Sequence, residues 1–292
     1  MCGICGFTGY RQDQKAVLER MMNVIEHRGP DSEGSFCRED IALGFRRLSI
    51  IDLEDGQQPM ESADGNLHIV FNGEIYDYKE LRAELETAGI SFRTHSDTEV
   101  LVNTLQQYGE KALDKLRGMF GFAVWDEKEQ TLMLARDFFG IKPLYYARID
   151  GHFVFASEIK SILAFPGYEK KVNQKALEQY LSFQYSPLEE TFFRGIYKLM
   201  PGHMLLYKNG NYEIKTYFKA KLAPGQCGSK TDMQQLQDRL SEVLKDSVKH
   251  HMLSDVEIGA FLSGGVDSGY LASASGADQA FTVGFDEGDQ YS

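Results

Sequence analysis

Residues 1–7 read MCGICGF and place a cysteine immediately after the initiator methionine. A free cysteine thiol has a pKa of about 8.5, so a nucleophilic cysteine needs a base beside it. Removal of Met1 would expose the α-amine of Cys2, whose pKa of about 7.7 to 8.0 suits that role. Nucleophile and base would then share one residue, as they do where an N-terminal threonine is activated by its own amine. We therefore expect a mature chain that begins at Cys2.

Cys2 and Cys5 also form a C-x-x-C pair, which raises the alternative of a redox or metal site. A thioredoxin-like site requires a strand before that motif and a helix after it, and residue 2 leaves no room for the strand. We interpret Cys5 as a small buried apolar residue. The other two cysteines are Cys37 and Cys227. No basic and apolar export signal begins the chain, so the thiols are expected to be reduced and the protein cytoplasmic.

The composition is that of an ordinary globular protein and excludes some classes of partner. The chain has 292 residues, of which 42% are hydrophobic and 25% charged, which is enough for about two domains. Its net charge of −12 argues against nucleic acid, because phosphate contacts need clustered lysine and arginine. No apolar run approaches the roughly 20 residues that span a bilayer. We expect neither a nucleic-acid partner nor a membrane segment.

Strand signals dominate the sequence up to about residue 217. Helical spacing of apolar residues predicts helices at 16–26, 78–88, 98–108 and 174–182. Apolar, β-branched and aromatic segments predict strands at 41–45, 68–71, 120–126, 131–135, 144–149, 153–156, 204–208 and 212–217. Asp150-Gly151 and Asn209-Gly210 are strong hairpin signals. Because strands and helices come in blocks, residues 1–217 predict an α+β domain with antiparallel sheets.

The sequence changes character after residue 217. Residues 218–230 contain APGQCGS, which is typical of a linker. Residues 231–292 begin with a long amphipathic helix, followed by a short apolar strand at 258–262, the loop SGGVDS, a short helix and a strand at 280–285. This order is the βα unit of a parallel α/β sheet. The sequence therefore predicts a second, incomplete domain.

Several motifs follow the N-terminal cysteine in a fixed order. They read HRGPD at 27–31, RLSIID at 47–52, NGEIY at 72–76 and SDTE at 96–99. With MCGI, this set resembles the class II glutamine amidotransferases, which are N-terminal-nucleophile hydrolases. ARD with GIKPL between 135 and 144, and ASEIK at 156–160, narrow the resemblance to glutamine-hydrolysing asparagine synthetase. The resemblance implies a four-layer α/β/β/α sandwich glutaminase domain, followed by the start of a parallel ATP-pyrophosphatase-type domain.

The resemblance also implies roles for individual residues of the first domain. Amide hydrolysis needs donors where the oxyanion develops, and Asn72 and Gly73 offer a side-chain NH₂ and a backbone N–H, so they join Cys2 as catalytic residues. Arg47 would bind the α-carboxylate of glutamine and Asp97 its α-ammonium. The implied remainder of the glutamine pocket consists of Asn72, Gly73 and main-chain groups of Leu48, Ser49, Ile50, Ile51 and Glu74.

Simpler alternatives exist for these residues. Asn72-Gly73 could be an ordinary turn after a strand, and Arg47 and Asp97 could form surface ion pairs. We interpret Arg28 and Asp31 mainly as scaffold beside the nucleophile.

The loop SGGVDS at 263–268 lacks the G-K-[ST] of a Walker loop. A glycine-rich turn between a strand and a helix can still present several N–H groups to phosphate. The loop resembles the pyrophosphate loop of the ATP pyrophosphatases, although Gly269 stands where that family usually has serine. The implied ATP contacts are Leu262, Ser263, Gly264, Gly265, Val266, Asp267, Ser268 and Val283. Asp267 is the candidate to help hold Mg²⁺, and no residue is assigned firmly to a metal.

The resemblance implies a glutamine-dependent asparagine synthetase with glutamine, aspartate and ATP as substrates. Ammonia from glutamine would amidate aspartate, with release of AMP and pyrophosphate. Only about 60 residues follow the linker, whereas an independent α/β domain generally needs about 100 or more, so we expect a C-terminally truncated form or a fragment. The alternatives are an amidotransferase that acts on another carboxylate, and a truncated glutaminase or regulatory protein without synthetase activity. A homodimer is left open.

Overall fold

A computed structural model describes residues 1–50, 52, 55–221 and 233–284 of the chain. The chain divides into two compact units, Met1–Ala220 and Lys221–Ser292. Most of the sequence expected to form the linker lies outside the described residues.

The first unit contains a six-stranded antiparallel sheet that includes the N-terminal strand. Its order is β10 (Ile196–Lys198), β8 (Tyr145–Ile149), β9 (His152–Ala156), β1 (Gly3–Thr8), β3 (Ile41–Arg47) and β2 (Ser32–Arg38). Strand β1 pairs with β3 on one side and with β9 on the other. The backbone that follows Cys2 is therefore fixed along both edges.

A second six-stranded antiparallel sheet completes the strand content of this unit. Its order is β12 (Asn211–Thr216), β11 (His203–Lys208), β7 (Thr131–Arg136), β6 (Gly118–Asp126), β5 (Leu67–Ile75) and β4 (Met60–Glu61). Both predicted hairpin turns are confirmed, because Asp150, Gly151, Asn209 and Gly210 all have positive φ angles. Such angles match the twist of a two-residue hairpin.

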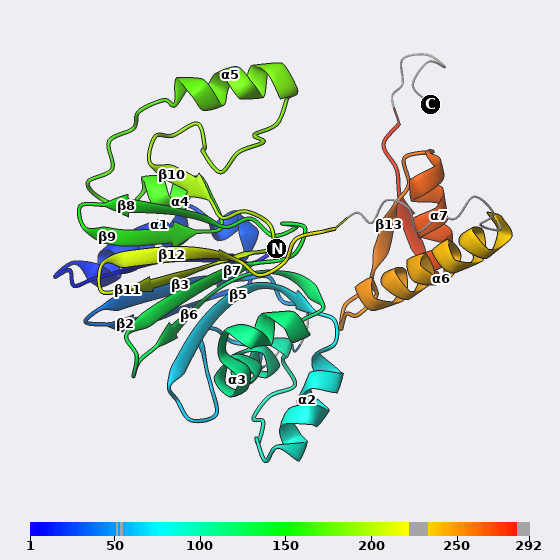
Figure 1. Ribbon diagram of the computed structural model, residues 1–292, viewed down its shortest axis with the longest axis horizontal. Coiled ribbons are helices and arrows are strands. Elements are labelled where there is room, and N and C mark those ends of the chain that lie inside the picture. Colours follow the sequence, from blue (N-terminus) through cyan, green and yellow to red (C-terminus); the bar gives the residue numbers. More distant parts are fainter. Residues whose placement is uncertain (51, 53–54, 222–232, 285–292) are drawn as a thin grey trace. The chain divides into compact units, whose positions relative to one another are not determined.

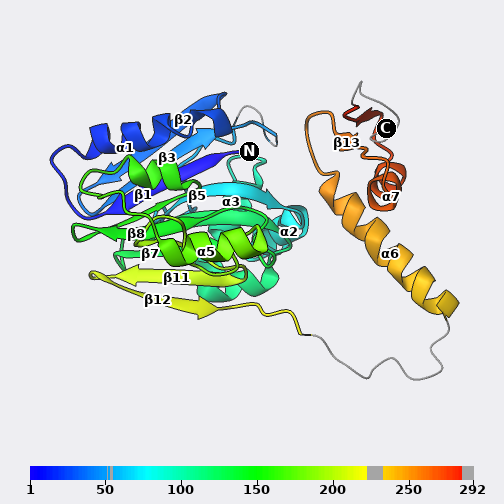
Figure 2. The same cartoon turned by 90° about the horizontal axis from the view of Figure 1, so that it is seen from above.

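The two sheets stack face to face with helices on both outer faces (Figures 1 and 2). Helices α1 (Gln14–Asn23) and α4 (Ile159–Leu163) cover the first sheet, with the 3₁₀ turn η1 (Glu26–Arg28) beside them. Helices α2 (Tyr78–Thr87) and α3 (Asp97–Tyr108), with η2 (Gly109–Lys115), cover the second. A third apolar cluster fills the space between the sheets. The predicted four-layer α/β/β/α sandwich is confirmed. Helix α5 (Gln174–Phe183) lies outside these layers.

Strands β1, β2, β4 and β10 are not predicted from the sequence. Every residue of β1 is buried, because helices cover one face of its sheet and the second sheet covers the other. A strand buried on both faces has no apolar–polar alternation. Its glycines, Gly3 and Gly6, further weaken the strand signal.

The second unit consists of α6 (Met233–His251), β13 (Gly259–Phe261), α7 (Val266–Ser275) and β14 (Gln279–Phe281). Strands β13 and β14 are parallel neighbours joined through α7, which is the predicted βα unit. The predicted apolar face of α6 is largely exposed, since Leu240 is 60% and Val243 58% accessible. Val248, near the end of the helix, is buried. In the part of the chain that the structure describes, no helix is both long and apolar enough to cross a membrane.

Candidate active site

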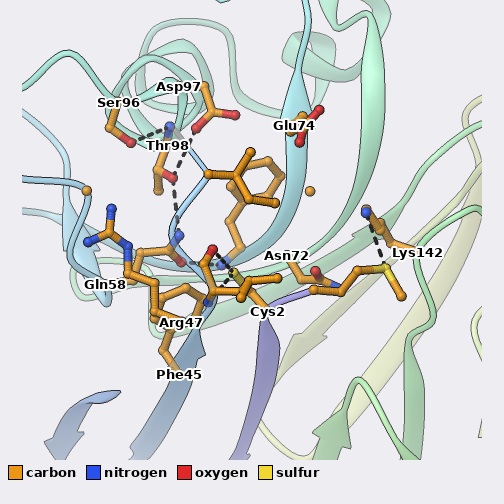
Figure 3. A pocket seen from close by; sticks show the side chains of 16 residues that line it. Cys2, Phe45, Arg47, Gln58, Asn72, Glu74, Ser96, Asp97, Thr98 and Lys142 are labelled. Atoms are coloured by element: carbon orange, nitrogen blue, oxygen red, sulfur yellow. Dashed lines mark hydrogen bonds between the residues drawn. The ribbon is translucent and has the colours of Figure 1, made fainter. Parts of the chain in front are cut away.

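A pocket opens beside Cys2 and draws its walls from both sheets and from the start of α3 (Figure 3). In this view Cys2, Asn72 and Lys142 lie at one end, and Ser96, Asp97 and Thr98 lie at the other. The lining residues are Met1, Cys2, Phe45, Arg47, Leu48, Ile50, Gly56, Gln58, Phe71, Asn72, Gly73, Glu74, Ser96, Asp97, Thr98 and Lys142. Most residues expected from the sequence to bind glutamine therefore meet in one cavity.

The Cys2 side chain is partly buried and packs against the backbone of Leu48. Its Sγ lies 3.4 Å from the Leu48 amide nitrogen and 3.5 Å from the Leu48 carbonyl oxygen. Burial raises the pKa of the Cys2 thiol, while the Leu48 amide and the cations of Arg47 and Lys142 act in the opposite direction. A thiol with a raised pKa is mostly protonated at neutral pH, so the nucleophile needs a local base.

The terminal amine is placed in the same environment as the thiol. Burial lowers the pKa of the Met1 ammonium, opposed by Cys2 and assisted by the nearby cations of Arg28 and Lys142. An amine with a lowered pKa is more often unprotonated near neutral pH, which is the state that can accept a proton. The surroundings of the N-terminus thus favour the basic form of an amine.

Cys5 does not share the site of Cys2. Cys2 packs against the apolar cluster between the sheets, whereas Cys5 belongs to the cluster under α1. The Cys5 thiol is fully buried, and burial raises its pKa to about 12. Cys2, Cys5 and Cys37 are free thiols, and within the described residues there is no cluster of three or more metal-ligating side chains. Cys2 and Cys5 therefore pack in different layers of the unit.

Asn72 lies within β5, opposite Gly121 of β6, and its side chain lines the pocket. The Asn72 Nδ2 atom is buried and has no hydrogen-bond partner among the described residues. Leaving a buried donor unpaired costs about 1–3 kcal/mol, so such a group calls for an explanation. Gly73 follows on the same strand, where a Cβ atom would overlap the Met119 carbonyl oxygen. Only glycine allows the backbone to pass at this point.

Asp97 is a buried carboxylate at the first position of α3. It is 5% exposed and accepts a hydrogen bond from the Ile75 amide at 3.0 Å. Burial raises its pKa to about 7, and Glu74 adds to the shift. Within the described residues it makes no ion pair. A ligand ammonium in this pocket would supply the missing charge.

Arg47 ends β3 and is buried on a different wall of the same pocket. Its guanidinium donates to the carbonyl oxygen of Asp52. A Cβ atom on Gly56 would meet this guanidinium closely, so the small residue leaves it room. The pocket therefore carries a guanidinium and a carboxylate, the two groups that recognise a free α-amino acid.

The loop that follows β3 is held by Asp31. The Asp31 amide donates to the Arg47 carbonyl at 3.0 Å, and its carboxylate accepts from the Ser49 amide at 2.8 Å. Leu48 and Ile50 reach the pocket, and Ser49 does not line it. Ile51, also expected in the glutamine pocket, lies outside the described residues. The contacts of Asp31 are those expected of a scaffold residue.

Two residues without a role predicted from the sequence, Gln58 and Lys142, also line the pocket. Gln58 accepts a hydrogen bond from the Phe71 amide at 2.6 Å and donates to Thr98 at 3.2 Å, so it joins β5 to α3. Lys142 is buried, and its Nζ lies 3.4 Å from the Met1 sulfur. Lys142 falls inside the quoted GIKPL motif, which could have indicated it. No motif surrounds Gln58.

The residues expected to contact ATP lie in the second unit, between β13 and α7. Gly264 has a φ of +80°, and Gly265 caps α7. The hydroxyl of Ser268 lies 3.0 Å from that of Ser263 and donates to the Gly265 carbonyl at 3.1 Å, which closes the loop. Asp267 and Val283 are exposed, and Leu262 is half-buried. The turn therefore sits at the carboxyl end of a parallel strand and the N-terminus of a helix, where phosphates commonly bind.

Comparison with known proteins gives the family. Residues 1–218 match the model of the glutamine amidotransferase domain, and residues 239–292 match that of asparagine synthase. The chain is 43% identical to "Asparagine synthetase [glutamine-hydrolyzing] 1" of Bacillus subtilis over 97% of its length and 46% of the relative's. It is also 32% identical to "Asparagine synthetase [glutamine-hydrolyzing] 3" of the same organism over 100% of its length and 49% of the relative's. It thus spans about half the length of these relatives.

Among solved structures, the glutamine phosphoribosylpyrophosphate amidotransferase of B. subtilis is similar in fold. The TM-score is 0.58 at 18% sequence identity, and the match covers 96% of this chain and 65% of that one. This likeness extends to the fold alone. Taken with the family match over residues 1–218, the pocket and the four-layer sandwich lead to one conclusion: the chain belongs to the glutamine amidotransferase domain family.

Proposed function

We propose that the first unit hydrolyses glutamine to glutamate and ammonia, with Cys2 as the nucleophile. The observation that carries this proposal is the unpaired Nδ2 of Asn72 in the same pocket as the Cys2 thiol. A buried donor without a partner, in the same pocket as a nucleophile, can donate to an oxyanion that exists only during the reaction. Arg47 and Asp97 would hold the carboxylate and ammonium of glutamine.

The reaction follows from the groups in the pocket. The α-amine of Cys2, free after removal of Met1, takes the thiol proton as Sγ attacks the carboxamide carbon. The Asn72 NH₂ and the Gly73 N–H donate to the resulting oxyanion. The ammonium of Cys2 returns the proton to the leaving nitrogen, so ammonia departs and a thioester remains. The same amine then activates water, which releases glutamate and restores the thiol.

We further propose that the whole protein uses this ammonia to make asparagine. The asparagine synthase family match and the loop Ser263–Ser268 support this part. The loop is polar and exposed to solvent, and hydrogen bonds of its serine hydroxyls hold its two ends together. Such a loop fits a phosphate group. ATP would activate the β-carboxylate of aspartate as an adenylate with loss of pyrophosphate, and ammonia would displace AMP. Mg²⁺ would be bound mainly by the phosphates of the nucleotide, because the loop Ser263–Ser268 contains a single carboxylate, that of Asp267.

The organisation we propose is a glutaminase domain at 1–217, a linker at 218–230 and the start of a synthetase domain at 231–292. An amidotransferase for a different carboxylate remains the alternative, because the loop would serve any acceptor that is adenylated. A truncated glutaminase or regulatory protein without synthetase activity is the other alternative. A cytoplasmic location and a homodimer stay predictions.

Replacement of Cys2 by alanine tests the glutaminase proposal. Cys2→Ala is expected to abolish glutamate release from glutamine, because no other thiol lines the pocket among the described residues. The variant should still bind glutamine, since Arg47 and Asp97 are intact. Intact-mass spectrometry of the active protein should find Met1 removed. Glutaminase turnover near the wild-type rate in Cys2→Ala, or an active chain that keeps Met1, would exclude this mechanism.

A further inference from the structure

Glu158 lies at the centre of a charged cluster immediately before α4. Its Oε1 accepts a hydrogen bond from Arg28 Nη1 at 2.9 Å and lies 2.9 Å from His27 Nε2. Its Oε2 lies 3.2 Å from Lys160 Nζ. The Arg28 side chain is only 8% exposed and that of Glu158 is 25% exposed. These contacts lower the pKa of the Glu158 carboxyl against the opposing effect of burial, so it is charged near neutral pH.

Arg28 connects this cluster to the nucleophile. Its Nε donates to the Cys2 carbonyl oxygen at 2.9 Å, while its Nη1 is held by Glu158. Residues around η1 pack closely on the start of β1, because a Cβ on Gly3 would lie 3.0 Å from Ile25 Cδ1 and 3.4 Å from Arg28 Cδ. At Gly29 a Cβ would overlap the Arg46 backbone, so η1 presses directly against β3. Glu158 therefore acts on the peptide of Cys2 through one rigid guanidinium.

Ser157, the residue before Glu158, holds β1 two residues after Cys2. Ser157 accepts a hydrogen bond from the Ile4 amide at 3.0 Å through its hydroxyl, and its own amide donates to the Ile4 carbonyl at 2.8 Å. The end of β9 therefore restrains the first residues of the chain at two places. This matters because a chain terminus is ordinarily among the least ordered parts of a protein.

We propose that Glu158 is a positioning residue for hydrolysis at Cys2. By holding Arg28 it orients the Cys2 carbonyl, and it thereby keeps the thiol and the α-amine of Cys2 aligned with Asn72. The inference rests on the proposed glutaminase function. Arg28 Nη2 is already buried without a hydrogen-bond partner among the described residues. Loss of Glu158 would leave Arg28 free to seek other acceptors and to release the Cys2 peptide.

The charges that face the terminal amine come from several elements. Arg28 and Lys142 lower the pKa of this amine and Asp31 raises it. Glu158 itself is not among these groups, so its neutralisation should change the position of the nucleophile more than the protonation of the terminal amine. We therefore expect kcat to fall while the pH at which activity is lost on the acid side stays unchanged.

The test compares Glu158→Gln and Glu158→Ala with Glu84→Gln in the full chain. Glu84 is a matched control, since it also accepts from two side chains, Tyr108 at 2.6 Å and Lys115 at 2.7 Å, and lies on α2 outside the pocket. We expect kcat for glutamine hydrolysis to fall about ten- to hundredfold in both Glu158 variants, the loss typical of a misplaced reacting group. KM should stay within about twofold, because Arg47 and Asp97 are untouched. Glu84→Gln should keep its kcat.

Folding is controlled by the thermal midpoint and by counting the reactive Cys2 thiol with iodoacetamide. If Glu158→Ala does not fold, the isosteric Glu158→Gln decides the question. A kcat of Glu158→Gln per reactive thiol within twofold of wild type would overturn the proposal. A rise in KM at constant kcat would also overturn it, because that result assigns Glu158 to substrate binding. Persistent glutaminase activity in Cys2→Ala would instead refute the proposed function itself.

Discussion

At the scale of single residues, the pocket leaves two groups unsatisfied. Asn72 Nδ2 has no hydrogen-bond partner, and Asp97 makes no ion pair, among the described residues. Both conditions cost stability in the free protein. In the proposed reaction each group meets a different part of glutamine, so these two unfavourable contributions to stability would be relieved at different stages. Asp97 would be satisfied when substrate binds and Asn72 when the oxyanion forms.

The Asn72→Ala variant is predicted to lose turnover with little change in binding. Removal of one oxyanion donor typically lowers kcat by about 10² to 10³, because the interaction exists mainly in the transition state. Steady-state kinetics of glutamate release would measure this, with KM expected near the wild-type value. A variant in which only KM changed would mean that Asn72 contacts the ground state instead.

The raised pKa of Asp97 predicts pH-dependent glutamine binding. In the proposed complex the α-ammonium of glutamine pairs with the Asp97 carboxylate, whose pKa in the free protein is raised to about 7. The apparent Kd for glutamine should therefore rise as the pH falls below about 7, by about tenfold per unit at the limit. Calorimetry of the inactive Cys2→Ala protein from pH 5.5 to 8.5 would measure it. Asp97→Asn should bind weakly with no such slope, and a slope retained in Asp97→Asn would contradict the assignment.

Stability of the unliganded protein should change with pH in the opposite direction. The folded pKa of about 7 lies above the ordinary value of 3.8, so between these limits the folded state binds the extra proton. The Asp97 contribution to folding is thus fully present below about pH 4 and is lost as the pH rises through about 7. Glutamine should raise the thermal midpoint more at pH 8 than at pH 6.

At the scale of elements, the pairing of β5 with β6 depends on Gly73. A Cβ at this position would overlap the Met119 carbonyl oxygen on the facing strand. Each strand has a further neighbour elsewhere along its length, since β5 pairs with β4 at Ile69 and β6 pairs with β7 from Gly121. The Gly73 N–H is also an expected oxyanion donor, which makes the site sensitive to small shifts of this strand.

Gly73→Ala is therefore predicted to destabilise the first unit by about 1–3 kcal/mol, the usual cost of overpacking a buried site. Chemical denaturation monitored by circular dichroism would measure the change. Gly121→Ala on the paired strand is the matched control, because its Cβ would lie 3.3 Å from the nearest heavy atom and needs only a slight adjustment. Equal losses in both variants would mean that the close contact at Gly73 is not the cause.

At the scale of the whole molecule, the two units differ in how much core they contain. The first has three apolar clusters enclosed by sheets and helices. In the second, β13 and β14 form a two-stranded parallel sheet, with Phe261 and Phe281 exposed. Parallel sheets are ordinarily covered on both faces. The described part of the second unit offers no such cover.

A polypeptide of residues 1–292 is accordingly predicted to hydrolyse glutamine and to make no asparagine when given aspartate, ATP, Mg²⁺ and ammonia. Assays for glutamate, asparagine and pyrophosphate would measure the two activities separately. Amide hydrogens of α7 and β13 should exchange faster than those of β1 and β5, since their burial is slight. Stoichiometric asparagine and pyrophosphate from this polypeptide would show that residues 1–292 suffice for synthesis.

The sequence by itself determined most of the elements and which residues to expect together at a site. The motifs around Cys2, Arg47, Asn72 and Asp97 carry a resemblance that implied a glutamine pocket, and these four residues line one cavity. Hairpin signals such as Asp150-Gly151 are local, since they depend only on the φ angles that two neighbouring residues tolerate. Such features can be predicted because their causes lie within a few residues of one another.

Only the tertiary structure decided features whose cause is distant in sequence. Strand β1 cannot be predicted from an alternation of apolar and polar residues, because other layers of the unit bury both its faces. The place of Gln58 depends on partners in β5 and α3, and the link from Glu158 through Arg28 to Cys2 joins residues 158, 28 and 2. The unpaired state of Asn72 and the raised pKa of Asp97 likewise arise from burial. Burial depends on how the whole unit packs, and no local pattern encodes it.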